Sequence, residues 1–415
     1  MRTSHWRSWS TGTRLAAITA MAAALTACAR HGAPAPSANW VASWAPSQQL
    51  VEPRNLPPAP GLTGSTLRQV LRLSIGGRAV RFHFSNVFGA SPVALNAAHV
   101  ALSAGGSAIR PESDRALTFG GRSSVAIAAG EAVVSDPLDL ALAPFTDLTV
   151  TIAFGATSAD VTGHPGSRAT SFLQAGDWST AAALPGAVKT EHWYVLSGAD
   201  VVADDASAAL VALGNSITDG RGSGTDQNDR WTDNLARRLR ADPRTAHVAV
   251  LNAGLGGNAV IRGGLGPTAL SRLDRDVAAP AGARWLIVLE GVNDIGNTRD
   301  SAAVAAIAGE LIAAYQRIIA VAHEHGLRAY GATILPFGGS NYDTGPAREV
   351  ARQAVNRWIR TSGAYDAVID FDAVMRDSLN PARLRADGDV GDHLHPNETG
   401  YHLMADAIDL ALFAR

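Results

Sequence analysis

The chain has 415 residues, of which 47% are hydrophobic and 17% are charged. This composition supplies a packed core and excludes a disordered chain or a coiled coil, and the length fits about two domains of ordinary size. The 35 basic and 37 acidic residues leave a formal net charge of −2. That balance argues against nucleic acid as a partner and against a basic surface for anionic lipid.

The N-terminus has the pattern of an export signal. Three arginines precede an apolar stretch over 15–25, which is too short to cross a bilayer but suits the core of a signal peptide. Cys28 is the only cysteine and closes Leu-Thr-Ala-Cys, which resembles a bacterial lipobox. We expect a lipoprotein-type signal peptide over 1–28, lipidation of Cys28 and a tether over 29–39. The alternative is an ordinary cleaved signal with an incidental cysteine.

The following region alternates apolar and polar residues with a period of two from about 67 to 154, which is typical of strands with one buried face. Two such runs, 71–75 and 80–84, flank Gly76 and Gly77, and we interpret them as a hairpin. A one-faced sheet buries its apolar side on another sheet. Residues 40–203 are therefore expected to form an antiparallel β-sandwich or jelly roll.

From residue 204 to the end, short apolar runs alternate with helical patterns. Five runs are predicted to be strands: 208–213, 248–251, 285–289, 329–335 and 367–369. Continuous apolar strands separated by helices indicate a parallel sheet covered on both faces. Residues 204–415 are therefore predicted to be a flavodoxin-like three-layer α/β/α domain, in which ligands bind beyond the carboxyl ends of the strands.

Polar segments follow these strands. Ser216 comes after the first strand, Asn293 after the third, and Asp392 and His395 precede the last helix. A serine hydroxyl becomes a nucleophile when an imidazole takes its proton and a carboxylate holds that imidazole in one tautomer. Asp392 and His395 lie three residues apart in a predicted turn, so they can serve Ser216 in this way. We predict a catalytic triad.

Acyl transfer also needs hydrogen-bond donors for the oxyanion of the tetrahedral intermediate. The predicted donors are the backbone N–H of Ser216, the backbone N–H of Gly257 and the side-chain amide of Asn293. Gly257 follows the second strand, where the missing Cβ permits close approach. Its neighbour Gly256 is the alternative donor.

These segments resemble the sequence blocks of the SGNH hydrolases, also called the GDSL lipase/esterase family. The four residues that name the family fall, in order, on Ser216, Gly257, Asn293 and His395, and Asp392 completes the triad. Segments such as 40–44 and 85–89 resemble the β domain of a bacterial two-domain subgroup, some members of which deacetylate xylan. One position departs from the family, which usually has Asp where this chain has Asn215. The departure bears on local electrostatics and rate rather than on the reaction class.

Other interpretations are weaker. The G-x-S-x-G elbow of α/β-hydrolases is not met, because Thr218 stands at its last glycine. A metal site could use Asp389, Asp392, His393 and His395, but no cysteine or third histidine joins them at zinc spacing. We therefore expect no metal and no cofactor. His164 could reach the active-site crevice, although a surface loop is the favoured interpretation.

The sequence thus predicts an exported serine esterase that hydrolyses short-chain acyl or acetyl esters through an acyl-enzyme. An acetylated plant polysaccharide is one candidate substrate. The alternatives are a lipase or acylhydrolase on lipid esters, and a non-catalytic glycan-binding surface lipoprotein. The expected location is the bacterial outer membrane, reached only through the lipid anchor, and otherwise the periplasm or the medium.

Overall fold

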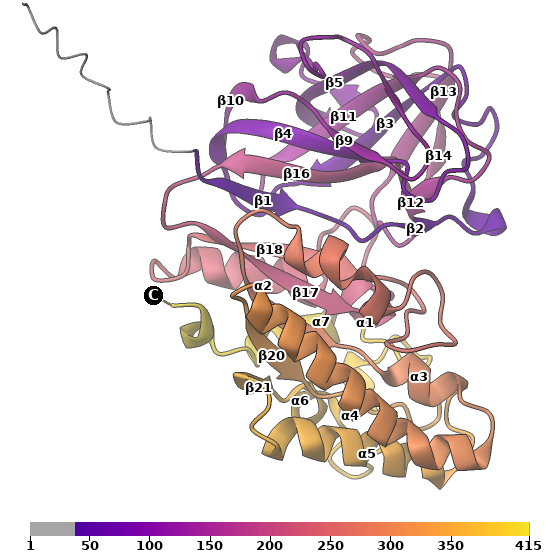
Figure 1. Ribbon diagram of the computed structural model, residues 1–415, viewed down its shortest axis with the longest axis vertical. Coiled ribbons are helices and arrows are strands. Elements are labelled where there is room, and N and C mark those ends of the chain that lie inside the picture. Colours follow the sequence, from indigo (N-terminus) through magenta and orange to yellow (C-terminus); the bar gives the residue numbers. More distant parts are fainter. Residues whose placement is uncertain (1–37, 415) are drawn as a thin grey trace, which may run out of the picture. The chain divides into compact units, whose positions relative to one another are not determined.

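The computed structural model describes residues 38–414, and Figure 1 shows how their strands and helices are arranged. The predicted signal peptide over 1–28, with its lipidation site Cys28, lies outside the described residues. So does the predicted tether over 29–39, except for its last two residues. These features stay predictions from the sequence.

The N-terminal part consists of antiparallel sheets, as the period-two pattern predicts. One sheet has the order β1 (Trp40–Trp44), β16 (Leu196–Val202), β4 (Gly77–Ser85) and β10 (Leu138–Leu142), with β9 (Ala132–Val134) beside β4. A second has the order β14 (Val188–Thr190), β13 (Ser171–Ala175), β3 (Ser65–Arg72), β11 (Asp147–Phe154), β5 (Val93–Gly105) and β6 (Ala108–Ile109), with β7 (Arg115–Ala116) and β8 (Val125–Ile127) beside β5. A third joins β15 (Trp193–Tyr194), β12 (Thr162–His164) and β2 (Gln49–Leu50).

The predicted hairpin around Gly76 and Gly77 is wrong. Strand β3 pairs with β11 and β13, whereas β4 pairs with β16, β10 and β9, so the two consecutive strands belong to different sheets. The connection is a corner between sheets, and the hydroxyl of Ser43 both donates to the carbonyl and accepts from the N–H of Ile75. A Cβ on Gly76 would lie 2.1 Å from the carbonyl oxygen of Leu142. Gly76 is therefore needed because the backbone of Leu142 approaches it closely. A glycine pair is typical of both a hairpin turn and such a corner, so the sequence does not distinguish them.

The C-terminal part contains one parallel sheet. Its order is β18 (Val248–Gly254), β17 (Ala208–Gly214), β19 (Ala283–Leu289), β20 (Arg328–Ala332) and β21 (Ala367–Ile369). The first strand along the chain thus lies between the second and the third, which is the predicted flavodoxin-like arrangement. All five predicted runs fall on these strands, although β20 ends three residues before its run does. The strand order reverses beside β17, where such sheets bind ligands.

Helices cover both faces of this sheet. The long ones are α2 (Trp231–Ala241), α4 (Ser301–Glu324), α5 (Pro346–Thr361) and α7 (Glu398–Asp406), and the short ones are α1 (Ser216–Asp219), α3 (Val292–Asn297) and α6 (Phe371–Met375). Helix α4 packs on α5 and helix α2 on α7, one pair on each face (Figure 1). The short helices α1 and α3 begin directly after β17 and β19. They carry side chains to the carboxyl edge of the sheet.

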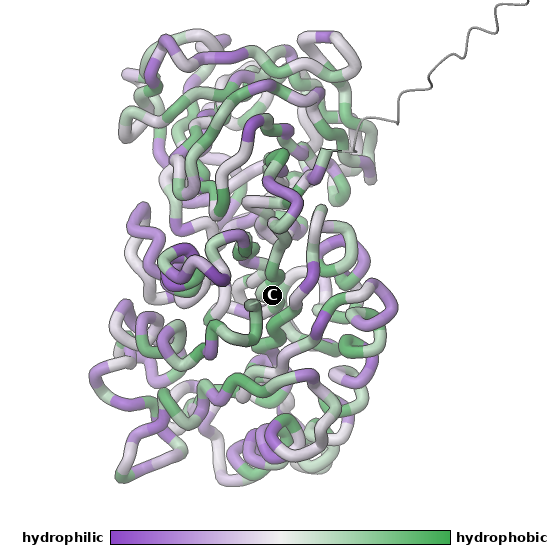
Figure 2. The backbone as a smooth tube through the Cα atoms, turned by 90° about the vertical axis from the view of Figure 1, so that its left-hand side faces the viewer, coloured by the Kyte–Doolittle hydropathy of each residue, from purple (hydrophilic) through white to green (hydrophobic). Residues whose placement is uncertain are grey.

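The two parts of the chain share one buried core. Apolar residues of the antiparallel sheets and of the parallel sheet belong to a single cluster, and Figure 2 shows hydrophobic segments in both parts. At the open edge of the parallel sheet, the N–H of Val250 on β18 donates to the hydroxyl of Ser74 at 2.8 Å. The N-terminal part therefore covers this edge. The predicted border between domains at 203 and 204 stays a prediction.

Candidate active site

Ser216 is the first residue of α1, immediately beyond the carboxyl end of β17. Asn215 caps the helix, and its side-chain oxygen accepts the N–H of Ile217 at 3.0 Å. A Cβ on Gly214 would lie 2.1 Å from the hydroxyl oxygen of Thr218, so the strand can turn sharply into the helix only at a glycine. This turn lifts the Ser216 hydroxyl above the sheet.

The three predicted triad residues form a continuous chain of hydrogen bonds. Ser216 Oγ lies 2.8 Å from His395 Nε2, and His395 Nδ1 lies 2.7 Å from Asp392 Oδ2. The second carboxylate oxygen of Asp392 accepts the N–H groups of Leu394 and His395 at 3.0 and 2.9 Å. Asp392 thus closes the turn that carries His395 and fixes the imidazole at the same time.

The surroundings keep Asp392 ionised and His395 neutral. Burial opposes the charge on Asp392, but hydrogen bonds from the His395 side chain and backbone outweigh it and hold the pKa of Asp392 below its usual value. Burial lowers the pKa of His395, Asp392 offsets part of this effect, and the positive charges of Arg221 and Arg168 add to the lowering. A neutral imidazole beside a hydroxyl can act as a general base.

Asn293 lies in the first turn of α3, with its side-chain amide fixed at both ends. Its nitrogen donates to the carbonyl of Asn258 at 2.6 Å, and its oxygen accepts the phenol hydroxyl of Tyr342 at 2.7 Å. An amide nitrogen has two hydrogens. The second hydrogen of Asn293 therefore stays available to an oxyanion.

The two predicted backbone donors are also available. Among residues 38–414 the N–H groups of Ser216 and Gly257 have no hydrogen-bond acceptor. Gly257 adopts a positive φ of 70°, which L side chains rarely adopt. A Cβ on Gly257 would also lie 2.9 Å from the side chain of Leu265.

One cavity of about 660 Å³ brings these groups together. The C-terminal part contributes the triad Ser216, His395 and Asp392, the donors Gly257 and Asn293, and also Gly256 and Tyr342. The N-terminal part contributes polar and charged residues: Gln49, Glu52, Arg54, Asn55, Arg168 and His192. Strand β2 and loops of the N-terminal part therefore supply one wall of the candidate active site.

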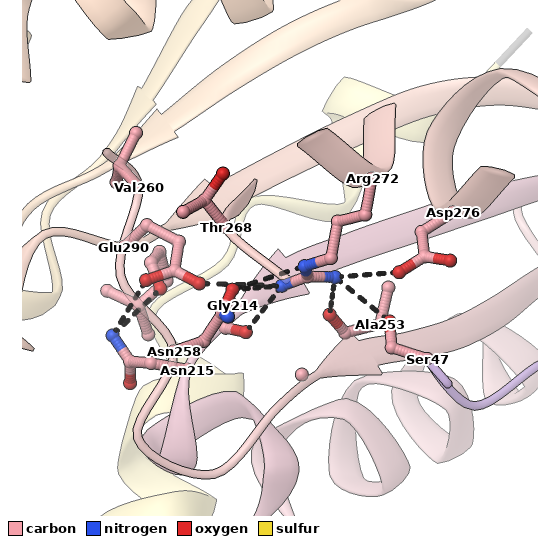
Figure 3. A network of polar contacts seen from close by, with 12 residues as sticks. Ser47, Gly214, Asn215, Ala253, Asn258, Val260, Thr268, Arg272, Asp276 and Glu290 are labelled. Atoms are coloured by element: carbon pink, nitrogen blue, oxygen red, sulfur yellow. Dashed lines mark hydrogen bonds and ion pairs between the residues drawn. The ribbon is translucent and has the colours of Figure 1, made fainter. Parts of the chain in front are cut away.

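A buried arginine, Arg272, connects the segments that carry the predicted site residues (Figure 3). Arg272 lies in the short helical turn Ala269–Arg272, and its side chain is fully buried. It donates to the carbonyls of Gly214 and Ala253, at the ends of β17 and β18, at 3.1 and 2.8 Å. It also donates to the side-chain oxygen of Asn258, at 2.8 Å, and to the hydroxyl of Ser47, at 2.9 Å. One guanidinium thus fixes the turn before the nucleophile and the loop beside Gly257.

Glu290 explains why Asn215 fits this site. The Asn215 side-chain nitrogen lies 3.3 Å from one carboxyl oxygen of Glu290, and the other oxygen lies 3.5 Å from Arg272. Burial raises the pKa of Glu290 to about 8, although Arg272 opposes the shift. An aspartate at 215 would place a second carboxylate in this buried space, whereas asparagine donates a hydrogen bond to the first.

His164 is not on a surface loop, so that interpretation is wrong. It ends strand β12, is buried, and stacks on Trp193 with ring centroids 5.7 Å apart. Its Nδ1 contacts the carbonyl of Ser47 at 2.8 Å, and its Nε2 lies 2.9 Å from a carboxylate oxygen of Asp219 in α1. His164 therefore supports the helix that carries Ser216. It does not line the catalytic cavity itself.

The residues of the metal alternative form two separate pairs. His393 Nδ1 lies 2.7 Å from Asp389, and His395 Nδ1 lies 2.7 Å from Asp392. Within the described range 38–414, no group of three or more His, Cys, Asp or Glu side chains is placed to hold a metal ion.

The model of the GDSL-like Lipase/Acylhydrolase family matches residues 212–403. This range contains every predicted residue of the triad and the oxyanion hole. Residues 212–403 are a GDSL-like lipase/acylhydrolase domain. The predicted family is thus confirmed for this region. The family consists of lipases and acylhydrolases, which is the predicted enzyme class, a carboxylic ester hydrolase.

Solved structures resemble about half of the chain at low identity. A G-D-S-L family lipolytic protein from Desulfitobacterium hafniense is 19% identical and has a TM-score of 0.38, with 48% of this chain and 97% of that chain covered. A GDSL-like lipase from Bacteroides thetaiotaomicron is 18% identical, with a TM-score of 0.36 and coverage of 49% and 87%. An acetylxylan esterase from Geobacillus stearothermophilus is 20% identical, with a TM-score of 0.37 and coverage of 48% and 91%. No curated protein matches the chain.

Three residues of the site are missing from the sequence prediction. Tyr342 lies in a loop and Arg272 in a short helical turn, and no local pattern marks them. Glu290 does carry a signal, because it is a charged residue directly after an apolar strand of a parallel sheet, where functional groups gather. All three act through long-range contacts with the predicted residues.

Proposed function

We propose that this protein is a serine esterase whose nucleophile is Ser216. The observation that carries the proposal is the unbroken chain of hydrogen bonds from Ser216 through His395 to Asp392. A serine with this neighbourhood loses its proton to the imidazole as it attacks, and the carboxylate stabilises the imidazolium that forms.

The reaction proceeds in two halves. Ser216 Oγ attacks the ester carbonyl carbon, its proton moves to His395 Nε2, and the carbonyl oxygen becomes an oxyanion held by Ser216 N–H, Gly257 N–H and the Asn293 amide. The bond to the alcohol oxygen then breaks, and His395 returns the proton to that oxygen, which leaves an acyl-enzyme. Water attacks the acyl carbon with His395 again as base, and the acid leaves as the Ser216 hydroxyl is restored.

The cavity favours a small acyl group and a polar alcohol. Most of its side chains are polar or charged, and the apolar ones are Leu255, Leu265, Leu394 and Pro165. A long acyl chain needs a continuous apolar channel to be taken out of water. We therefore propose short-chain acyl or acetyl esters as substrates, with an acetylated plant polysaccharide as one class, rather than lipid esters.

A fluorophosphonate probe and a chromogenic acetate ester test the assignment together. The wild-type protein should be labelled at Ser216 and should hydrolyse the ester, whereas Ser216→Ala should do neither while its circular dichroism spectrum is unchanged. Ser271→Ala changes an exposed serine outside the cavity and is the matched control, with labelling and turnover retained. Undiminished turnover in Ser216→Ala would overturn the mechanism. A wild-type protein that takes no label would favour the non-catalytic glycan-binding alternative.

Export is part of the same proposal and is supported by the sequence alone. We infer that residues 1–28 direct export and that Cys28 carries the lipid anchor, with residues 40–203 as a β-sandwich domain that shares a buried core with residues 204–415. Metabolic labelling with a radioactive fatty acid should tag the wild-type protein and not Cys28→Ala. Label in that variant would contradict the anchor.

A further inference from the structure

Three arginines line the catalytic cavity. Arg54 lies in the short helical turn Pro53–Asn55, after β2, and Arg168 lies in the loop after β12. Arg221 follows α1, close to the nucleophile. Two of the three thus come from the N-terminal part of the chain, and the proposed mechanism uses none of them.

The carboxylates of the same cavity already have protein partners. One oxygen of Glu52 accepts from the side chain of Gln49 at 2.7 Å, and the other accepts from Asn55 at 3.0 Å. Asp219 lies 2.9 Å from His164. Asp392 is occupied by His395 and by two backbone N–H groups. Within residues 38–414 the acidic groups therefore form no ion pair with Arg54 or Arg168, and only Arg221 lies within ion-pair distance of one of them, Asp392.

The arginines, in contrast, have almost no partners. Within residues 38–414 the guanidinium groups of Arg54 and Arg168 form no hydrogen bond and no ion pair, and the Nε of Arg168 is buried without an acceptor. The Nε of Arg221 lies 3.9 Å from Asp392, which is too far for a hydrogen bond. A buried donor without an acceptor costs free energy, so an acceptor that binds beside Arg168 would be stabilised by it.

The charges of two of these arginines reach the catalytic base. Arg168 and Arg221 line the same cavity as Ser216 and His395, and both contribute to lowering the pKa of His395. An anion bound there would occupy the same small space as the reacting substrate.

We propose that this cavity recognises a carboxylate on the ester substrate and that Arg168, flanked by Arg54 and Arg221, binds it. The planar guanidinium fork matches a carboxylate and binds it with charge-assisted hydrogen bonds. This inference rests on the proposed esterase function. The carboxylate can belong to the alcohol, as in an O-acetylated uronic acid sugar, or to the acyl group, as in the half-ester of a dicarboxylic acid.

Two matched substrate pairs distinguish these sources. The first pair is an O-acetylated oligogalacturonide and the same oligomer with its carboxylates methyl-esterified. The second is the mono-4-methylumbelliferyl ester of adipic acid and 4-methylumbelliferyl hexanoate, which have equal chain lengths. We expect wild-type kcat/KM to favour the charged member of one pair by roughly 10- to 100-fold, the range of hydrogen bonds to charged groups. The preference should shrink as salt screens it.

Arginine variants locate the recognition. In Arg168→Gln the charged-to-neutral ratio should fall by about tenfold, and Arg168→Lys should keep more of it than the glutamine. Arg357→Gln removes an exposed arginine of α5 outside the cavity and should leave the ratio unchanged. Arg54→Gln, at an exposed position, should also lower the ratio and keeps the test decisive if Arg168→Gln does not fold.

The outcomes separate this inference from the function on which it rests. A wild-type ratio near 1 in both pairs, with hydrolysis of the neutral esters lost in Ser216→Ala, overturns carboxylate recognition and leaves the esterase assignment intact. A preference that survives in both Arg168→Gln and Arg54→Gln overturns the role of these arginines. Failure of wild type to hydrolyse any of the four esters overturns both proposals.

Discussion

Replacing Glu290 with glutamine tests the charge state of the carboxyl group behind the nucleophile. Glu290 is buried, and it accepts the side-chain nitrogen of Asn215 and the N–H of Gly291, both at 3.3 Å. Glutamine keeps an acceptor oxygen for these contacts but cannot ionise. The part of the pH dependence of stability that belongs to this carboxyl must therefore disappear in Glu290→Gln.

The size of the effect follows from the shift of the pKa from 4.5 to about 8 on folding. Between these values the folded protein holds a proton that the unfolded chain has lost, so stability falls as the pH rises, by about 1.4 kcal/mol per pH unit. The penalty is absent below the unfolded value and complete above the folded one. From pH 5 to pH 8, the free energy of unfolding of Glu290→Gln should therefore rise relative to wild type by roughly 3 to 4 kcal/mol.

Urea unfolding at each pH unit from 5 to 8, followed by tryptophan fluorescence, measures this difference. Glu310→Gln is the control, because Glu310 is only partly buried and its hydrogen bond from Arg262 lowers its pKa, so the free energy of unfolding of this variant should not rise relative to wild type over this range. If Glu290→Gln and wild type have parallel profiles, Glu290 is ionised in the folded protein and held by Arg272. The reasoning about burial would then be refuted.

Three further predictions concern catalysis. Asp392→Asn should lower kcat by roughly 10³- to 10⁴-fold with little change in KM, because the imidazole loses its fixed tautomer; steady-state kinetics with a chromogenic ester checks this, and an unchanged kcat would contradict it. Since burial lowers the pKa of His395, the acidic limb of kcat/KM should lie below pH 6.5 and move to higher pH in Arg168→Gln; a limb at the same pH in both proteins would refute the electrostatic contribution of this arginine. Asn293→Ala should cost roughly 10²- to 10³-fold in kcat, whereas Tyr342→Phe should cost about tenfold, because the phenol only orients the amide; equal losses would assign Tyr342 a direct role.

Local pattern was enough to find the sheet and the groups that meet above it. The apolar runs at 208–213 and 285–289 lie on β17 and β19, and parallel strands end at one edge, so the residues that follow them had to gather there. The structure brings Ser216, Asp392 and His395 within hydrogen-bonding distance at that edge.

What the pattern could not give depends on partners far away in the chain. Runs on either side of Gly76 look alike whether the strands pair with each other or enter different sheets, because the choice depends on pairing with β11 and β16. His164 was misplaced for the same reason: its short strand is stabilised by pairing with β2 and β15. Arg272 donates hydrogen bonds to Ser47, Ala253 and Gly214, which lie in three different segments of the chain. No pattern near Arg272 in the sequence predicts these contacts.

Ser47 belongs to the link between β1 and β2, yet it serves the opposite half of the molecule. The Ser47 hydroxyl accepts a hydrogen bond from Arg272, and the Ser47 carbonyl contacts His164 Nδ1. Ser74, also in the N-terminal part, accepts the N–H of Val250 on the edge strand β18. Residues 204–415 therefore depend on contacts with the N-terminal part, and cutting the chain at the predicted border between 203 and 204 would remove these contacts. A truncation starting at residue 204 would leave one N–H of Arg272 buried without its acceptor Ser47. It would also expose the edge strand β18, which could then pair with other chains. A chimaera that replaces the N-terminal part should therefore keep residues 45–49 together with residues 204–415.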